Sequence, residues 1–208
     1  SLLKEIKKSG ILRLIVNEPK NKNALSKKMI SKLKEAISFA SSDDLVKVII
    51  IAANGNVYSA GHDLKEITEA RFHKDDGNSY FRDLFNSCSD LMKLIVESPK
   101  PIIAEVNGVA TAAGCQLVAS CDLAISSDDS RFATPGVNIG LFCSTPMVAL
   151  SRSISKKDAM KMLLTGDMIT ANEAKSISLI NDHVPEEELT ESVMQLAQKI
   201  AQKSSMTL

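Results

Sequence analysis

Two short and almost uninterrupted apolar segments constrain the fold of this chain more than any other feature. Residues 46–52 have the sequence VKVIIIA, and residues 101–106 have the sequence PIIAEV. Segments of this length that are rich in β-branched residues predict strands that are covered on both faces. Such strands are typical of a parallel sheet with helices on either side.

Helical patterns alternate with these strands. Ser26 is a suitable N-cap, and apolar residues recur at a spacing of three to four from Met29 to Ala40, which predicts a helix. Residues 12–16 and 123–126 predict further strands, and residues 69–78 predict a mobile polar loop. This alternation places the chain in the α/β class. More helices are predicted at residues 79–96 and 113–119, and the part from residue 146 to 208 is predicted to be helical, in segments 156–164, 171–177 and 187–203.

The last predicted helix, at residues 187–203, has one apolar face, which predicts packing on the core or on a partner subunit.

The composition predicts a single domain over residues 1–208, because 44% of the 208 residues are hydrophobic and a chain of this size buries enough surface for one core. The 25 basic residues balance 25 acidic ones, so the chain has no electrostatic basis for binding nucleic acid. No apolar stretch approaches the roughly 20 residues that cross a membrane, so we expect no membrane partner.

The four cysteines indicate a reducing compartment. They stand at positions 88, 115, 121 and 143, a spacing that matches no zinc motif, and a chain with a full core needs no disulfide framework. We therefore expect no metal site, and a location in the cytoplasm of a bacterium or, alternatively, in the mitochondrial matrix. The N-terminus has no signal-peptide pattern, so any targeting segment is expected to be either removed or absent.

Two turns of small residues are the strongest candidates for a functional site, because the P-loop, dinucleotide-binding, zincin and nucleophile-elbow motifs are all missing from the sequence. The turns SAGHD at 59–63 and TAAGCQ at 111–116 each follow a predicted strand and precede a helix. Small residues let a ligand approach the main chain, and the first amide groups of a helix are unpaired and carry positive dipole character. The pattern predicts an oxyanion site, although it is also typical of close packing without a function.

The order of these and other motifs resembles the enoyl-CoA hydratase/isomerase (crotonase) family over essentially the whole chain. The matching segments are NAL at 23–25, YSAGHDLKE at 58–66, NG at 107–108, AAGC at 112–115, SCD at 120–122, FATP at 132–135 and LTG at 164–166. The resemblance implies a crotonase-type spiral of ββα units with two nearly perpendicular sheets, usually assembled as a homotrimer or a dimer of trimers. It also implies an acyl-CoA thioester as substrate or ligand, without a separate cofactor, and a role in fatty acid metabolism.

By the same resemblance, the backbone N–H groups of His62 and Ala113 hold the thioester oxygen, and Gly114 opens the helix behind them. Two preorganised donors aimed at a developing enolate typically contribute about a hundredfold or more each. The resemblance also implies a path for the adenine and pantetheine groups, lined by Ala24, Ala60, Gly61, His62, Asp63 and Leu64.

The chain departs from the family at the positions that move protons. Hydratases of this family use two glutamates, and the matching positions here are Gln116 and Gly136. A carboxamide does not exchange protons usefully near pH 7, and glycine has no side chain. Some isomerases of the family place an aspartate at the position that matches Ser144, which is not a base either. We therefore expect weak hydratase activity.

Other polar groups offer few substitutes. The His62 side chain is one candidate proton carrier, and Cys143 is the strongest of the cysteines, which otherwise are expected to be small buried apolar residues. Gln116, Asn138 and Ser144 are candidates to orient a water. The remaining acids and histidines are expected to be structural: Asp63 as a turn cap, Asp122 as support for the strand that follows it, and His73 and His183 as surface residues.

Two functions stay open at this stage. The first is a lyase or isomerase of the hydratase type, and the second is a non-catalytic acyl-CoA-binding or regulatory protein. A serine peptidase with the same spiral would need an ordered Ser-His-Asp set, and the chain has only 3 histidines. The resemblance also implies some fifty further residues at the C-terminus, so we expect the C-terminal helical part to be truncated here.

Overall fold

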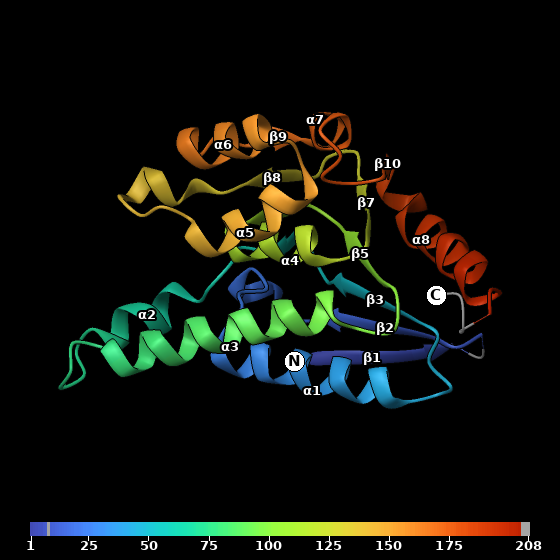
Figure 1. The fold of residues 1–208 in the computed structure, drawn as a ribbon, viewed down its shortest axis with the longest axis horizontal. Helices are drawn as coiled ribbons and strands as arrows, with labels where there is room; N and C mark the ends of the chain where they lie inside the picture. The colour runs from blue at the N-terminus through green and yellow to red at the C-terminus, as the bar shows by residue number, and fades with distance from the viewer. Residues whose placement is uncertain (8, 205–208) are drawn as a thin grey trace.

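A six-stranded sheet forms the centre of the molecule in the computed structural model, which describes residues 1–7 and 9–204 (Figure 1). Its strand order is β1-β2-β3-β5-β7-β10; β1 and β2 are antiparallel, and the other neighbours are parallel. The parallel strands predicted from the apolar segments are confirmed. The members are β1 (Leu2–Lys7), β2 (Ile11–Val16), β3 (Val48–Ala53), β5 (Ile102–Val106), β7 (Leu123–Ser127) and β10 (Asp182–Val184).

A second sheet of four short strands lies beside the first; the resemblance implies two sheets, but the residue patterns predict none of these short strands. Its order is β4-β6-β8-β9, with β8 and β9 antiparallel. The two turns of small residues follow β4 and β6 of this sheet rather than the long apolar strands directly, which corrects the prediction. The members are β4 (Val57–Ser59), β6 (Val109–Thr111), β8 (Arg131–Ala133) and β9 (Ile169–Thr170).

The helices follow pairs of strands. Each of β3, β5 and β7 is followed by a short strand of the second sheet and then by a helix, which is the ββα repeat that the resemblance implies. The helices are α1 (Lys27–Ser42), α2 (Leu64–Ala70), α3 (Asn78–Val96), α4 (Ala113–Ser120), α5 (Ser144–Ser153), α6 (Lys156–Thr165), α7 (Ala171–Ser176) and α8 (Glu186–Ala201), with 3₁₀ helices η1 (Pro19–Asn21) and η2 (Pro135–Ile139).

Most helix predictions hold within two residues, and Ser26 caps α1 by accepting a hydrogen bond from Met29 N. Two predictions need correction. The part from residue 146 onward is not wholly helical, because it contains β9 and β10. The loop predicted at 69–78 is shorter, because α2 extends to Ala70. Residues 205–208, at the end of the predicted helical part, lie outside the described residues.

The larger sheet is covered on both faces, as its sequence predicts. Alternate residues of β3 belong to two different clusters: Ile49 and Ile51 pack with α1, and Val48 and Ile50 pack with α8. Figure 1 shows α1 and α3 on one side of this sheet and α8 on the other. The apolar face of α8 therefore packs on the core. None of the helices in the described ranges is long and apolar enough to cross a membrane.

A buried ion pair ties α8 to the sheet. Arg13 on β2 donates two hydrogen bonds to Glu105 on β5, at 2.8 and 2.6 Å, and Thr190 Oγ1 on α8 donates to the same carboxylate at 2.8 Å. The Glu105 side chain is only 5% exposed. A carboxylate this deeply buried needs such partners, because burying an unpaired charge is very unfavourable.

Candidate functional site

The two turns of small residues meet each other in the folded chain. Gly61 has a φ of +86°, and a methyl group added to it would lie 3.0 Å from Ala112 Cβ and 3.2 Å from Ala113 N. Glycine is the residue that adopts this conformation and this close approach without strain. The first turn, which carries His62, therefore lies directly against the amide of Ala113.

The start of α4 is packed just as closely against the end of β4. A methyl group at Gly114 would lie 2.3 Å from Ser59 O and 2.8 Å from Ser59 Cβ. Ala112, which precedes α4, has a φ of 51° and a ψ of −121°, a conformation that costs an alanine free energy and that clusters at functional sites. These contacts fix where the first amide groups of α4 point.

The amide N–H groups of both turns are free to donate hydrogen bonds to a ligand oxygen. Among the hydrogen bonds of the described residues, neither His62 N nor Ala113 N has an acceptor, and the Ala112 side chain provides no cap for α4. Ala113 is only 2% exposed, and a buried N–H group without a partner is rare in proteins. The turn before His62 is held by Leu25 N, which donates to Gly61 O at 2.7 Å.

The His62 side chain is anchored to the protein beside these amides. Its Nδ1 lies 3.4 Å from Leu25 O, and its ring meets the Phe85 ring edge-on at a centroid distance of 5.4 Å. Burial lowers the pKa of His62, and the carbonyl of Leu25 and the charge of Glu66 offset this only in part. The imidazole is therefore mainly neutral at pH 7.

A cavity of about 360 Å³ contains most of the residues that the sequence assigned to the ligand path. Asp63 at its edge caps α2, as expected, by accepting a hydrogen bond from Lys65 N at 2.9 Å. The lining combines Ala24, Ala60, His62, Asp63 and Leu64 with Lys20, Asn21, Lys22 and Lys65. Sequence reasoning did not assign the three lysines to the site: Lys65 lies within the matching segment 58–66, and Lys20 and Lys22 lie just before the segment 23–25. Gly61 and Gly114, also predicted, are buried and do not belong to this lining.

A second cavity, of about 440 Å³, lies between α3, α4 and α5; we call it the three-helix cavity. Gln116 on α4 lines it, is only 4% exposed, and its Oε1 has no hydrogen-bond partner. This is the position where the family resemblance implies a glutamate. The other lining residues are Ser89, Met92, Lys93, Val96 and Glu97 on or next to α3, Ala119 and Ser120 on α4, and Thr145, Val148, Ala149 and Arg152 on α5.

Gly136, the other position where the family resemblance implies a glutamate, has no room for a side chain. A Cβ there would lie 2.3 Å from Leu141 O and 2.7 Å from Cys143 Sγ. The backbone of the segment after η2 therefore fills the space that a glutamate would need. Burial raises the pKa of the Cys143 thiol and raises that of Cys115 to about 12, so both remain protonated at pH 7 and are not activated nucleophiles.

The structure does not bring the other two water-orienting candidates to Gln116. Ser144 begins α5 and is exposed, and Asn138 in η2 is exposed as well. Neither residue lines the three-helix cavity, whereas Thr145, the neighbour of Ser144, does. Asp122 was predicted to support the strand that follows it. It is structural, but it supports β5 instead, by accepting a hydrogen bond from Ile102 N at 2.8 Å.

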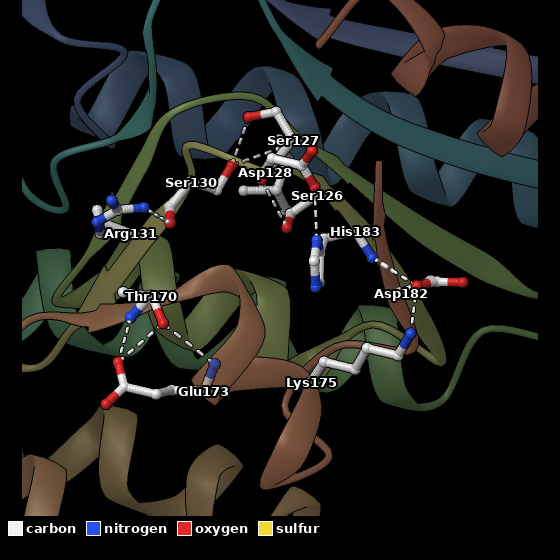
Figure 2. A network of polar contacts seen from close by, with 11 residues as sticks. Ser126, Ser127, Asp128, Ser130, Arg131, Thr170, Glu173, Lys175, Asp182 and His183 are labelled. Carbon is white, nitrogen blue, oxygen red and sulfur yellow. Dashed lines mark hydrogen bonds and ion pairs between the residues drawn. The ribbon is translucent and has the colours of Figure 1, made fainter. Parts of the chain in front are cut away.

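The serine-peptidase alternative gains no support from the histidine with an acidic partner. His183 Nδ1 lies 2.5 Å from Asp128 Oδ1, so this residue is paired rather than a plain surface residue (Figure 2). The nearby hydroxyls are used elsewhere: Ser127 and Ser130 are hydrogen-bonded to each other at 2.8 Å, and Ser130 Oγ donates to Val106 O. Within the described ranges, no serine is hydrogen-bonded to the His183 ring.

Comparisons with known proteins agree on one family. A family model described as Enoyl-CoA hydratase/isomerase matches residues 6–208. The mitochondrial enoyl-CoA hydratase domain-containing protein 3 of Xenopus laevis is 53% identical over 195 residues, covering 94% of this chain and 65% of the relative. The human protein of the same name is 51% identical, with 94% and 63% covered. The chain thus spans slightly less than two thirds of these relatives.

Solved structures give the same result for the fold. The crystal structure of human enoyl Coenzyme A hydratase domain-containing protein 3 matches with a TM-score of 0.91 and 48% identity, covering 98% of this chain and 78% of that one. An enoyl-CoA hydratase of Mycobacterium smegmatis matches with a TM-score of 0.92 and 43% identity, covering 98% and 77%. The predicted crotonase-type fold is therefore confirmed.

Proposed function

The chain belongs to the enoyl-CoA hydratase/isomerase family, and we propose that it binds an acyl-CoA thioester and hydrates enoyl-CoA esters only weakly. The observation that carries the proposal is the meeting of two turns whose amides, at His62 and Ala113, have no acceptor within the described residues. Two such donors that converge on one oxygen would stabilise an enolate or bind a thioester carbonyl.

The cavity beside His62 supports a coenzyme A ligand. Three lysines, Lys20, Lys22 and Lys65, line it together with small apolar residues. Lysine is a common partner of phosphate groups, and coenzyme A carries three phosphate groups on its nucleotide part, which is joined to an uncharged pantetheine arm. A thioester whose carbonyl lies at the two amides would therefore place its phosphates near these ammonium groups.

The missing proton carriers support weak hydration. General acid or base help is typically worth about 10²- to 10⁴-fold. Gln116 does not titrate, and Gly136 has no side chain and no space for one. The oxyanion donors would still polarise the thioester, so slow addition of water to the double bond is expected rather than none.

The test is a paired measurement of binding and turnover with crotonyl-CoA. We expect calorimetry to detect binding of the thioester more tightly than of free coenzyme A, and hydration to run far below the rate of about 10 s⁻¹ that is typical of enzymes. Turnover at that typical rate would contradict the proposal, and so would equal affinity for free coenzyme A and the thioester. Treatment with a chelator is expected to change neither result, because we propose no metal or further cofactor.

A restored glutamate tests the role of the missing carriers. Gln116→Glu places a carboxylate on the wall of the three-helix cavity and is expected to raise hydration of crotonyl-CoA at least tenfold, a modest share of the usual value of such a group. Gly136→Glu is expected to unfold the segment after η2, because its Cβ would lie 2.3 Å from Leu141 O. Unchanged hydration in a folded Gln116→Glu protein would contradict this role.

The second candidate is a non-catalytic acyl-CoA-binding or regulatory protein. The packing around Gly136 favours it, because backbone atoms and a thiol occupy the place of one proton carrier. Binding without any turnover above the uncatalysed rate would support this candidate over the first.

The proposed location follows from the names of the relatives, and the proposed assembly from exposed apolar side chains. The two relatives from Xenopus laevis and human are mitochondrial by name, so we propose that this protein acts in the mitochondrial matrix, with a role in fatty acid metabolism. We also propose a homotrimer or a dimer of trimers, supported by large apolar side chains exposed near η2 and the end of α6, namely Ile139, Leu141, Leu164 and Met168. Exposed apolar patches commonly mark protein contacts. Light scattering that shows a monomer at micromolar concentration would contradict the assembly.

A further inference from the structure

The turn between β3 and β4 contains one of the two Asn-Gly sequences of the chain. Asn54-Gly55 lies in this turn, and Asn107-Gly108 lies in the turn between β5 and β6. Asparagine loses ammonia most readily in an Asn-Gly sequence, because glycine has no Cβ to hinder the attack of its main-chain nitrogen on the asparagine side chain. The two turns differ in how firmly the structure restrains this reaction.

Asn54-Gly55 is exposed, and the nitrogen that would react is free. Both residues are exposed, Gly55 has a φ of +90°, and Gly55 N has no acceptor among the hydrogen bonds of the described residues. The Asn54 side chain donates one hydrogen bond at the surface, from its Nδ2 to Asn17 Oδ1 at 3.1 Å. The two reacting groups and water therefore meet at this turn under little restraint.

Asn107-Gly108 is held more firmly. Both residues are half-buried, and Asn107 Nδ2 donates to Glu186 Oε1 at 2.9 Å and to Gly55 O at 3.3 Å. Gly108 N donates to Ser127 Oγ at 3.4 Å, so the nitrogen that would attack is already engaged. The chain thus contains the same dipeptide twice, once free and once restrained.

We propose that Asn54 is a site of spontaneous deamidation and isomerisation that loosens the lysine-bearing wall of the cavity beside His62. In the first step Gly55 N bonds to Asn54 Cγ, the Cγ–Nδ2 bond breaks, and ammonia leaves with the proton that Gly55 N gives up. Water then opens the cyclic imide that has formed. Breaking the bond between Gly55 N and Cγ gives aspartate. Breaking the bond between Gly55 N and the original main-chain carbonyl carbon gives isoaspartate, in which the main chain runs through the former side chain.

The main-chain carbonyl of Asn54 supports a buried asparagine next to the cavity. Asn23 is 0% exposed, and its Nδ2 donates to Asn54 O at 2.8 Å and to Val57 O at 2.6 Å. Asn23 and Lys22 have φ values of 49° and 52°, a left-handed conformation that a residue other than glycine keeps only when its surroundings hold it. Isoaspartate at position 54 turns the carbonyl that Asn23 binds into a free carboxylate and moves the main chain, so this turn loses a support.

The turn at Lys22 carries one side of the cavity beside His62. Lys22 lines that cavity together with Lys20 and Asn21. Its main-chain oxygen accepts a hydrogen bond from Ala60 N at 3.1 Å, which ties it to the first turn of small residues. The expected effect on coenzyme A esters rests on the proposed function, whereas the covalent change and the loosening of the turn do not.

The experiment stores the full chain in mildly alkaline buffer and follows both Asn-Gly sequences by peptide mapping, with aspartyl and isoaspartyl peptides separated before mass spectrometry. We expect Asn54 to convert about tenfold faster than Asn107 in the folded protein, a ratio that a barrier difference of about 1.4 kcal/mol produces. In concentrated urea, where neither turn is folded, we expect the two sites to convert at similar rates.

Limited trypsin digestion measures the loosening of the turn without any ligand. Lys20 and Lys22 are exposed, and we expect cleavage after them to be about fivefold faster in the stored protein, the effect of losing one hydrogen bond. Binding of crotonyl-CoA is expected to weaken by about the same factor. Asn54→Gln is the matched control, because it keeps the main-chain carbonyl and closes a larger imide ring only slowly. It is expected to match the fresh protein before and after storage.

Asn54→Asp separates the new charge from the altered main chain. This variant has the charge of the aspartate product on an ordinary main chain, so it is expected to bind crotonyl-CoA as the fresh protein does. Conversion of Asn107 as fast as Asn54 in the folded protein would overturn the proposed site. Unchanged trypsin cleavage and unchanged affinity in protein that carries isoaspartate at position 54 would overturn the link to the cavity. Failure of the fresh protein to bind any coenzyme A ester would overturn the proposed function alone, because the peptide map and the digestion do not depend on it.

Discussion

Replacing Gly114 with alanine is expected to destabilise the protein and to weaken acyl-CoA binding, although alanine is the better helix former. Gly114 is the second residue of α4, and its φ is not positive, so alanine fits the backbone conformation. Helix propensity alone therefore predicts a gain of up to about 1 kcal/mol. The surroundings predict the opposite, because the added Cβ would lie 2.3 Å from Ser59 O.

The size of the effect follows from this distance. Ordinary contact between such atoms needs about 3.5 Å, so α4 and β4 must separate by about 1 Å. Overpacking of this kind costs about 1–3 kcal/mol, which outweighs the propensity gain at the end of a helix. For a chain of this length, a net loss of about 1–2 kcal/mol lowers the Tm by about 5 °C. The same shift moves Ala113 N away from His62 N, and losing one donor's hydrogen bond is expected to weaken acyl-CoA binding about tenfold.

Thermal unfolding and calorimetric titration with crotonyl-CoA measure the two effects separately. The control is Gly140→Ala, where no atom lies within 4 Å of the added Cβ but φ is +76°. This variant is expected to lose about 1 kcal/mol through backbone strain and to bind acyl-CoA normally. If Gly114→Ala proves more stable than the parent and binds with the same affinity, the close approach of α4 to β4 does not position the Ala113 amide, and the reasoning is wrong.

Three further predictions test charge, stability and pH dependence. Lys65→Glu reverses one charge in the cavity beside His62, and isothermal titration at low salt is expected to show about tenfold weaker binding of coenzyme A esters, with a smaller difference at 1 M salt because ions screen exposed charges; no salt dependence would contradict a phosphate contact. Glu105→Ala removes the bidentate partner of the half-buried Arg13, which keeps its contact with Glu5 at 3.3 Å, and is expected to cost about 2–3 kcal/mol in urea unfolding, because a hydrogen bond to a charged group contributes about 1.5–3 kcal/mol; a loss below 1 kcal/mol would show that the pair is dispensable. Since burial lowers the pKa of His62 from its ordinary value of 6.5, the unfolded chain binds more protons just below pH 6.5, so stability should fall as the pH drops through 6.5 toward the lowered folded value. His62→Gln is expected to have a flatter stability profile in that window, and an identical slope would refute the assignment.

The long strands could be predicted from the sequence because burial on both faces leaves a clear local pattern. β3 is apolar at nearly every position, and its alternate residues face two different cores. The strands of the second sheet are only two or three residues long. A segment such as Val57–Ser59 is too short to have a periodicity, and only pairing with distant strands makes it a strand. The sequence located the two turns of small residues correctly, but it did not predict the short strands β4 and β6 that precede and orient them.

The candidate site likewise contains some residues that the sequence could predict and others that it could not. The small residues around Gly61 and Gly114 have a local signal, because close approach of backbones excludes side chains. The lysines of the cavity beside His62 were not predicted, although Lys65 lies within a matching segment, because surface lysines are common and only the fold brings Lys20 and Lys22 near Lys65. The family resemblance singles out Gln116 as an expected departure, whereas its unpaired oxygen depends on how α3 and α5 enclose it.

The proposed oxyanion donors and the proton carriers that the family resemblance implies differ in how easily a substitution removes them. The proposed oxyanion donors are backbone N–H groups, which every residue except proline supplies, so only a change in packing, as at Gly114, removes them. The proton carriers would be side chains, and a single substitution removes each of them. At Gly136 the loss also involves the neighbouring structure, because Leu141 O and Cys143 Sγ occupy the space of a glutamate. Regaining proton transfer at this position therefore requires the segment after η2 to move, whereas Gln116 needs only the exchange of an amide for a carboxylate.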